Sequence, residues 1–366
     1  MSTSETVRGP ARVAIIGGTG YGGAELIRLL HRHPAVALTR VTSIDHVGEP
    51  LEAVHRNLGR TGLRFEDTAP ADAMRDVDVV FLALPHKVTA SLGPQLAATT
   101  AKIIDLSGDF RLRDAAAYRS FYGQVHPHPE MLGSFVYGLP ELHREAIAAS
   151  TRVASPGCFA TSIALGVLPM VRAGWLRGPI RTVAATGSSG SGAYASEGTH
   201  HPVRVNNLKT YKVLDHQHTP EIEQTLRDAA ARWPAEGSAP VQLLFVPVSA
   251  PLSRGILANS FLDVPASVDA DAVAAAFAAM YERAPLVRVL GGGKVQAEVV
   301  AVKGSMWADV SWTLGPVDAR TGTRHLVVTS ALDNLVKGGA GQAVQSMNVM
   351  LGLPDGTGID AVPLWP

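Results

Sequence analysis

The chain has 366 residues, 46% of them hydrophobic, which is long for a single core and predicts two domains. Its 32 Lys and Arg residues balance 32 Asp and Glu residues, and a net charge of zero argues against a general nucleic-acid-binding or membrane-surface role. A single cysteine excludes an internal disulfide, and no apolar run has the roughly 18 residues of a membrane span. The first ten residues lack the apolar core of a signal peptide, so we expect a cytoplasmic protein.

Strand-like and helical patterns alternate in the first part of the chain. Strands are expected at residues 12–17, 36–43, 77–84 and 101–106, and helical periodicity lies around residues 23–33 and 88–98. This alternation is typical of parallel βαβ units. We therefore predict an α/β fold whose first part is a Rossmann-type, doubly wound parallel sheet.

The first strand and the first helix are joined by the glycine-rich sequence GGTGYGG, residues 17–23. Gly18, Gly20 and Gly23 match the G-x-G-x-x-G pattern, in which glycine permits a tight turn and lets the backbone approach a pyrophosphate. The pattern predicts a dinucleotide site, and the alternative is a glycine-rich turn that binds nothing. The candidate cofactor-binding residues of this turn are Gly17, Gly18, Thr19, Gly20, Tyr21 and Gly22.

The end of the second strand should distinguish NAD from NADP. An acidic side chain there binds the free ribose hydroxyl of NAD, whereas an arginine accommodates the 2′-phosphate of NADP. Asp45 lies 22 positions after Gly23, and Arg40 is the nearest basic residue. These two residues leave the cofactor preference open.

After residue 158 the pattern changes. Strands are expected at residues 181–186, 241–248, 255–264, 296–303, 307–314 and 325–332, and a helix from 335 to 350. Several of these strands alternate apolar and polar residues, which indicates a mixed or antiparallel sheet with one solvated face.

The cysteine, Cys158, follows a tight turn in SPGC and begins an apolar helical run. A cysteine in the first turn of a helix faces unpaired backbone N–H groups and the positive end of the helix dipole, which both favour the thiolate. Cys158 is therefore a candidate nucleophile. The alternative is a buried structural cysteine.

Two histidines, His216 and His218, lie in the sequence DHQHTPE, residues 215–221. No further clustered cysteine or histidine completes a four-ligand set, so we expect no metal site. One histidine near Cys158 could act as general base and acid. The alternative is a histidine that only fills the surface or core.

The chain resembles the N-acetyl-γ-glutamyl-phosphate reductases (type 1). The blocks that carry the resemblance appear in the family's order from residue 12 to about 352: GGTGYGGAELIRLL, DLSGDFRL, VYGLPEL, SPGC, HQHTPEIEQ and DNLVKGGAGQAVQSMN. The resemblance implies a fold similar to aspartate-semialdehyde dehydrogenase. Residues 1–157 and 333–366 would form the Rossmann domain, and residues 158–332 an inserted α/β catalytic and oligomerisation domain with a mixed sheet.

The resemblance also implies a reaction. The Cys158 thiolate attacks an acyl phosphate, phosphate leaves, and the thioester accepts hydride from NADPH to release an aldehyde. His216 is the favoured acid/base, with an exchange of roles with His218 left open. The remaining cofactor-binding residues implied are Ser43, Pro85, His86, Ser188, Gly190 and Asn334, and the substrate-binding residues are Arg111, Ser155, Gly157, Gln217 and Arg254.

Residues 197–212 depart from the common pattern. They resemble a neighbouring subgroup that reduces an α-aminoadipyl or glutamyl phosphate attached to a small acidic carrier protein. Arg204, Lys209 and Lys212 would suit such a carrier, although a solvated basic face is the commoner meaning of such residues. The substrate's N-substituent and chain length therefore stay open.

Two further expectations concern assembly and class. We expect a homodimer or homotetramer formed through the second domain. The alternative to an enzyme is a dinucleotide-sensing Rossmann protein in which Cys158 is structural.

Overall fold

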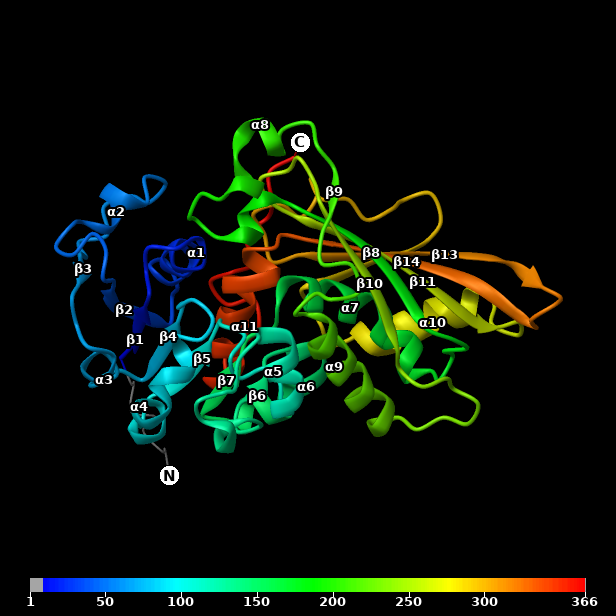
Figure 1. Ribbon diagram of the computed structural model, residues 1–366, viewed down its shortest axis with the longest axis horizontal. Coiled ribbons are helices and arrows are strands. Elements are labelled where there is room, and N and C mark those ends of the chain that lie inside the picture. Colours follow the sequence, from blue (N-terminus) through cyan, green and yellow to red (C-terminus); the bar gives the residue numbers. More distant parts are fainter. Residues whose placement is uncertain (1–8, 366) are drawn as a thin grey trace, which may run out of the picture.

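The computed structural model describes residues 9–365, which form two seven-stranded sheets lying side by side (Figure 1). Residues 1–8 lie outside the described residues, and they are most of the first ten residues, in which we expect no signal peptide. No helix within residues 9–365 is long and apolar enough to cross a membrane.

The first sheet is entirely parallel, with strand order β3-β2-β1-β4-β5-β7-β6. From β1 the chain builds outward first to one side and then to the other, which confirms the doubly wound prediction. Its strands are β1 (Ala11–Ile16), β2 (Val36–Thr42), β3 (Phe65–Glu66), β4 (Val79–Leu82), β5 (Lys102–Asp105), β6 (Val136–Tyr137) and β7 (Arg152–Ala154). The helices in this part are α1 (Tyr21–Leu30), α2 (Leu51–Val54), α3 (Pro70–Ala73), α4 (Gly93–Ala98), α5 (Ala115–Tyr122) and α6 (Pro140–Ala149).

The second sheet is mixed, as predicted, with strand order β12-β13-β14-β11-β8-β10-β9. The pairs β8/β10 and β12/β13 are parallel, and the other pairs are antiparallel. Its strands are β8 (Ile180–Thr186), β9 (Lys209–Thr210), β10 (Leu243–Ser249), β11 (Ile256–Pro265), β12 (Val287–Gly292), β13 (Ala308–Asp318) and β14 (Thr323–Leu332).

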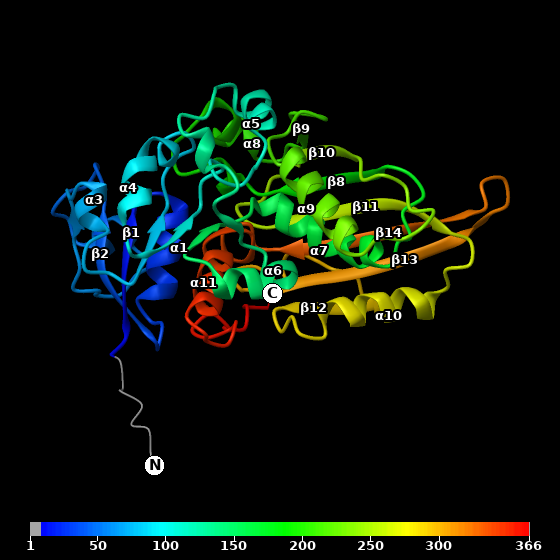
Figure 2. The same cartoon turned by 90° about the horizontal axis from the view of Figure 1, so that it is seen from below.

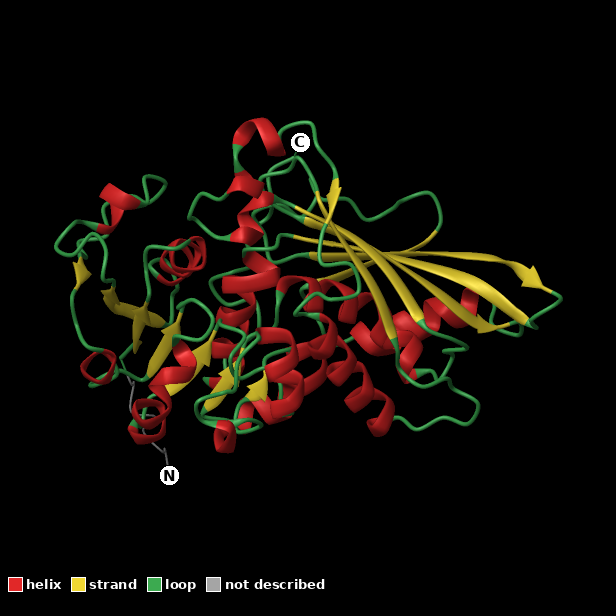
Figure 3. Ribbon diagram, viewed as in Figure 1, coloured by secondary structure: helices red, strands yellow, loops and turns green. Residues whose placement is uncertain are grey.

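Helices cover one face of this second sheet. They are α7 (Cys158–Arg172), α9 (Thr219–Arg232) and α10 (Ala270–Tyr281), while the short α8 (His201–Arg204) lies beyond the strand ends. Figure 3 shows the helices below the sheet and only loops above its right-hand part. The buried residues of β8, β10 and β11 alternate with exposed or partly exposed ones, because only the helix-covered face is closed.

The strand predicted at residues 296–303 is wrong. This segment is loop and turn, and Ala297 and Val302 pack in a small cluster with Ala331 instead of pairing in the sheet. The strand that pairs with β13 is β12, which is not predicted from the sequence because it ends in two glycines. Position 292 of β12 requires glycine, because a Cβ atom there would lie 2.3 Å from the Trp312 ring.

The last segment returns to the first sheet, and its helix lies between the two sheets in both ribbon views (Figures 1 and 2). The predicted helix 335–350 consists of a π-helical stretch, Val336–Ala340, followed by α11 (Gly341–Met350), which packs against α1 and α6. The fully buried Lys337 donates to Glu141 at 2.6 Å and to Gln345 at 2.7 Å. This buried ion pair holds the returning segment on α6.

Candidate active site

Cys158 is the first residue of α7, directly after the turn that follows β7. The turn residue Gly157 is in van der Waals contact with His218, since a Cβ atom at Gly157 would lie 2.3 Å from His218 Nε2. Gly338 closes the other side, where a Cβ atom would lie 2.8 Å from Cys158 Cβ. The cysteine is thus held between the start of α9 and the returning C-terminal segment.

A buried carboxylate, Glu221, fixes this turn. Its Oε1 atom accepts hydrogen bonds from the Gly157 N–H at 2.6 Å and the Tyr137 hydroxyl at 2.7 Å, and its Oε2 atom lies 3.5 Å from Arg111 Nη1. Glu221 lies in the first turn of α9, so the same helix start carries both the carboxylate and His218. Sequence reasoning missed Glu221 and Tyr137, although both lie in the sequence blocks that carry the family resemblance.

Arg111 is buried beneath the turn. Its Nε donates to the Ser155 carbonyl at 2.7 Å and its Nη2 to the Leu106 carbonyl at 2.9 Å. Burial opposes its charge, but the neighbouring Glu221 carboxylate raises the pKa of Arg111 above its ordinary value. Arg111 therefore stays charged at the base of the site, and most of its contacts are with the backbone that shapes the cysteine turn. Ser155 lies in this turn with its Oγ buried and without a hydrogen-bond partner among the described residues.

The two histidines lie together on the second-sheet side. The His218 backbone N–H donates to His216 Nδ1 at 3.1 Å, and the His216 ring packs edge-on against Phe159 and Phe245. Burial lowers the pKa of His216 to about 2, and burial together with the nearby Arg111 lowers the pKa of His218 well below its usual value. Both rings are neutral at neutral pH, the form that accepts a proton.

Burial and the helix start act on the Cys158 thiol in opposite directions, and the helix-start N–H groups lower its pKa as the sequence predicts. Burial raises the pKa of the Cys158 thiol to about 11, which outweighs the lowering by Arg111 and by the helix-start N–H groups. The thiol therefore carries its proton at neutral pH. A base must take that proton before the sulfur can act as a nucleophile.

The glycine-rich turn lies at the carboxyl end of β1, at the start of α1. The N–H groups of Gly17 and Gly18 donate to the Thr42 carbonyl at 3.1 and 2.9 Å, and Gly17 has a φ of +92°. A Cβ atom at Gly23 would lie 2.6 Å from the backbone of Gly18, whereas one at Gly20 would meet nothing within 4 Å. The turn is thus closely packed at Gly23 and open at Gly20, in front of the N-terminus of α1. A pyrophosphate site requires such an opening.

Hydroxyl groups gather beside this turn. Ser43 Oγ lies 3.4 Å from Thr19 Oγ1 and accepts a hydrogen bond from the Asp45 N–H at 3.0 Å. The Asp45 carboxylate in turn accepts a hydrogen bond at 3.0 Å from Tyr194, which belongs to the long segment after β8. Arg40, the other cofactor-selecting candidate, pairs with Glu66 at 3.1 Å.

Asn334 connects two loops at the end of the second sheet. Its Oδ1 accepts the Gly255 N–H at 2.7 Å, and its Nδ2 donates to Ser189 Oγ at 3.0 Å. A Cβ atom at Gly190 would lie 3.7 Å from Asn334 Nδ2, so these two candidate residues are neighbours. Ser188 belongs to the same loop and donates its N–H to the Leu252 carbonyl at 2.8 Å.

The other candidate residues are more dispersed. Pro85 and His86 follow β4 and are exposed, with His86 Nδ1 accepting the Gly108 N–H at 2.7 Å. Gln217 accepts a hydrogen bond from Lys212 Nζ at 2.7 Å. Arg254 is paired with Glu25 of α1 and lies 3.6 Å from Asp333, and its role as a substrate ligand stays a prediction. The ion pair between Arg254 and Glu25 therefore joins the loop between β10 and β11 to α1.

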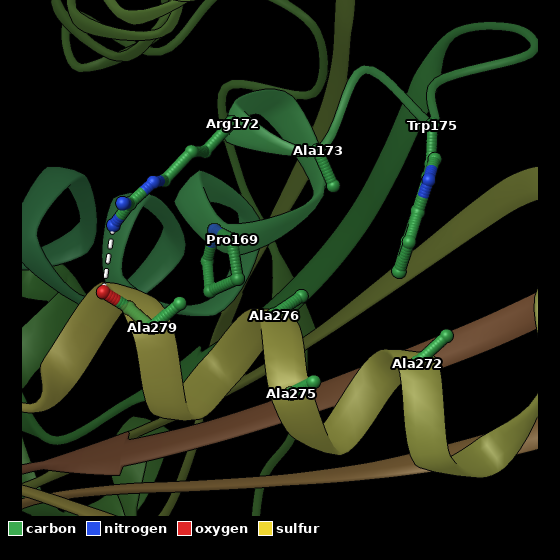
Figure 4. Close-up of a pocket in the computed structure, with 8 residues that line it drawn as sticks. All are labelled: Pro169, Arg172, Ala173, Trp175, Ala272, Ala275, Ala276 and Ala279. Carbon is green, nitrogen blue, oxygen red and sulfur yellow. Dashed lines mark hydrogen bonds between the residues drawn. The ribbon is translucent and has the colours of Figure 1, made fainter.

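A separate hollow lies at the opposite end of α7, between that helix end and α10 (Figure 4). Arg172 Nη1 donates to the Ala279 carbonyl at 2.7 Å there, and Trp175 and alanine side chains line it. Pro169, the lining residue nearest to Cys158 along the helix, lies eleven positions after it, roughly 16 Å away. It is not part of the candidate active site.

Known families match both parts of the chain. A family model described as semialdehyde dehydrogenase, NAD binding domain, matches residues 12–150, and one described as semialdehyde dehydrogenase, dimerisation domain, matches residues 158–334. A curated N-acetyl-gamma-glutamyl-phosphate reductase from Desulfotalea psychrophila is 42% identical over 359 residues, which cover 97% of this chain and 99% of the relative. The chain belongs to the N-acetyl-gamma-glutamyl-phosphate reductase family.

This family membership makes the chain a phosphorylating semialdehyde dehydrogenase with an NAD(P)-binding domain. A putative [LysW]-L-2-aminoadipate 6-phosphate reductase from Thermomicrobium roseum is almost as similar, at 40% identity over 360 residues, 97% of this chain and 99% of the relative. Relatives with both activities thus lie at nearly the same distance.

Solved structures confirm the expected fold. Aspartate semialdehyde dehydrogenase II of Vibrio cholerae, complexed with ASA, matches with a TM-score of 0.67 at 18% identity, covering 94% of this chain and 99% of that chain. The aspartate semialdehyde dehydrogenase of Candida albicans, solved with NADP, matches with a TM-score of 0.63 at 13% identity, covering 95% and 99%.

The buried Glu221 charge should control the thiol of this family member. Glu221→Gln keeps an oxygen that can accept from Gly157 and Tyr137 but removes a negative charge that raises the pKa of Cys158. We expect the thiol pKa to fall, and iodoacetamide to alkylate the cysteine at pH 8 roughly three- to tenfold faster. Because the chain has one cysteine, mass spectrometry reports this thiol alone.

The matched control is Glu223→Gln, two residues further along α9, where the carboxylate accepts the Leu243 N–H and pairs with Arg227. Its alkylation rate should equal that of the unaltered chain. An unchanged rate in a folded Glu221→Gln variant would contradict the assigned electrostatic role.

Proposed function

We propose that this enzyme reduces N-acetyl-γ-glutamyl phosphate with NADPH to N-acetylglutamate 5-semialdehyde and phosphate, a step of arginine biosynthesis. The observation that carries the proposal is the only cysteine of a reductase-family chain, placed at a helix start next to a neutral histidine and above a buried arginine. The second candidate is the same chemistry on a carrier-protein-linked α-aminoadipyl or glutamyl phosphate. It is favoured by the 40% identity to the Thermomicrobium roseum relative and by the exposed Lys209 and Lys212.

The chemistry begins with the protonated thiol. A neutral histidine takes the Cys158 proton, the sulfur forms a bond to the acyl carbon, and the bond to the phosphate oxygen breaks so that phosphate leaves with its electron pair. When bound, the reduced nicotinamide supplies hydride to the thioester carbon. The C–S bond then breaks, the aldehyde is released, and the sulfur regains its proton. Backbone N–H groups at the start of α7 and the Arg111 charge below them stabilise negative charge during these steps.

The contact between His218 and Gly157 favours His218 over His216 as the acid/base. The turn 17–20 and the N-terminus of α1 would hold the cofactor pyrophosphate. NADP is the proposed cofactor because the Thr19 and Ser43 hydroxyls can donate to a 2′-phosphate, and because a solved enzyme of the same fold contains NADP.

The test is the reverse reaction, followed by absorbance as phosphate-dependent reduction of NADP⁺. N-acetylglutamate 5-semialdehyde and its aminoadipate homologue are offered in parallel. We expect turnover with the five-carbon aldehyde and its loss in Cys158→Ser, which should still bind NADP⁺. Turnover by Cys158→Ser would exclude the thioester mechanism. Turnover of the homologue alone would favour the second candidate, as would silence with both aldehydes followed by turnover of a carrier-linked one.

The two histidines can be separated by substitution. His218→Asn should lower kcat by about 100-fold or more, the usual contribution of a general base, whereas His216→Asn should have the smaller effect. Because the pKa of each histidine is lowered, the base is neutral across the neutral range and its protonation should not limit the rate between pH 6 and 8. A larger loss in His216→Asn than in His218→Asn would reverse the assignment.

We also propose that the uncovered face of the second sheet joins two copies of the chain. Phe261 of β11 and Val183 of β8 lie on this face and are 44% and 42% exposed, and the matching family model is described as a dimerisation domain. Exposed apolar side chains on one sheet face are typical of an interface between subunits.

Phe261→Glu should therefore shift the chain from oligomer to monomer in size-exclusion chromatography with light scattering. Val125→Glu, at a 65% exposed valine beside the first sheet, should leave the assembly unchanged. A Phe261→Glu variant that elutes with the mass of the unaltered assembly would rule out this face.

A further inference from the structure

Arg204 is a partly buried arginine with only neutral partners. Its Nη2 donates to the Thr186 carbonyl at 3.0 Å and its Nη1 to Ser249 Oγ. Its Nε is buried and makes no hydrogen bond within residues 9–365, and no carboxylate among them lies within 4 Å of the guanidinium. A guanidinium withdrawn from water is normally paired with an anion, so its charge lacks a counterpart here.

Arg111 and Arg254 do not share this feature. Arg111 has Glu221, and Arg254 has Glu25 and Asp333. Arg204 uses two of its five N–H donors and keeps three, including the Nε–H. A carboxylate can bind two parallel donors of a guanidinium.

Arg204 also lies at the strand ends of the second sheet that lead to Tyr211, a neighbour of His216. Thr186 and Ser249, its partners, are paired residues at the carboxyl ends of the parallel strands β8 and β10. Tyr211 follows β9 at the same sheet edge, and its ring lies 5.7 Å from the His216 ring. Burial raises the pKa of Tyr211, with Cys158 raising it further and Arg204 lowering it. The Tyr211 hydroxyl therefore lies within electrostatic range of both the Cys158 thiol and the Arg204 guanidinium.

We propose that Arg204 binds the carboxylate of the substrate and selects acyl phosphates that carry one. The inference rests on the proposed function, because it assigns a ligand feature to that same site. N-acetylglutamyl and carrier-linked aminoadipyl phosphates both retain a carboxylate beside the substituted nitrogen, so the assignment holds for either substrate. The proposal also gives Arg204 a different role from Lys209 and Lys212, which are exposed and remain available to a carrier protein.

The test compares two ligands that differ only by this carboxylate. N-acetylglutamate and 4-acetamidobutanoate are used to protect Cys158 from iodoacetamide, which requires no turnover. For the six-carbon case the pair is N-acetyl-α-aminoadipate and 5-acetamidopentanoate. The pair that protects Cys158 at the lower concentration is used for the comparison. In the unaltered chain, we expect its dicarboxylate to halve the alkylation rate at a concentration about 10- to 100-fold lower than the monocarboxylate requires. This range is the usual contribution of hydrogen bonds to a charged group.

Arg204→Gln should remove this difference, and Arg204→Lys should restore part of it. Ser249→Ala and Lys209→Gln should both keep it, since the first removes only the contact between Arg204 and β10 and the second removes a nearby exposed charge. Loss of discrimination in Ser249→Ala and Arg204→Gln alike would assign Arg204 to holding the strand ends. Equal protection by both ligands in the unaltered chain, or discrimination that persists in Arg204→Gln, would overturn the proposal.

A second readout uses turnover. With N-acetylglutamate 5-semialdehyde in the reverse reaction, Arg204→Gln should raise KM about 10- to 100-fold while kcat changes little. With 4-acetamidobutanal, which lacks the carboxylate, the variant and the unaltered chain should agree within threefold. Failure of the proposed function would appear as turnover by Cys158→Ser, whereas failure of this inference would appear as retained discrimination by Arg204→Gln.

Discussion

The candidate active site depends on one buried carboxylate. Glu221 is fully buried, and a carboxylate in that position must be compensated by hydrogen bonds and a positive charge. The compensation comes from the Gly157 N–H, the Tyr137 hydroxyl and Arg111, which all belong to the first-sheet side, while Glu221 itself lies on α9. Loss of Arg111 would leave this charge buried without a partner, at a cost of about 3–5 kcal/mol.

This arrangement has a geometric consequence. The hydrogen bond from Gly157 to Glu221 fixes the start of α7 relative to the start of α9, and His218 is the residue before α9. In the proposed mechanism, this one contact positions both the nucleophile Cys158 and the base His218. The glycine is needed because any side chain at 157 would overlap the His218 ring. Burial raises the pKa of the Cys158 thiol and lowers the pKa of His218, so both groups are neutral before the proposed proton transfer. The same shifts make that transfer unfavourable by itself, so it must accompany attack of the sulfur on the acyl carbon.

The local patterns were readable from the sequence, and the long-range contacts were not. The strand 12–17, the glycine turn and the cysteine at a helix start were predicted because each depends on neighbouring residues. Glu221 was missed because its partner Arg111 is 110 positions away, and the pairing of Arg254 with Glu25, 229 positions away, could not be predicted from local patterns either. The net pKa of the Cys158 thiol could not be predicted for the same reason, because the burial that raises it depends on the whole fold.

The placement of charge shows which cations a chain with no net charge can offer to the proposed substrate, which carries a phosphate and a carboxylate. Lys337, Arg111 and Arg254 each face a carboxylate in the interior, so their charges stabilise the fold and add little net attraction for a ligand. Within residues 9–365, Arg204 and Lys212 form no ion pair with a carboxylate, and both lie on the segment between β8 and α9. Tyr194 of this segment also contacts Asp45 beside the glycine turn. One segment therefore contacts Asp45 beside the glycine turn and also carries Arg204, so in the proposed function its position affects the binding of both cofactor and substrate.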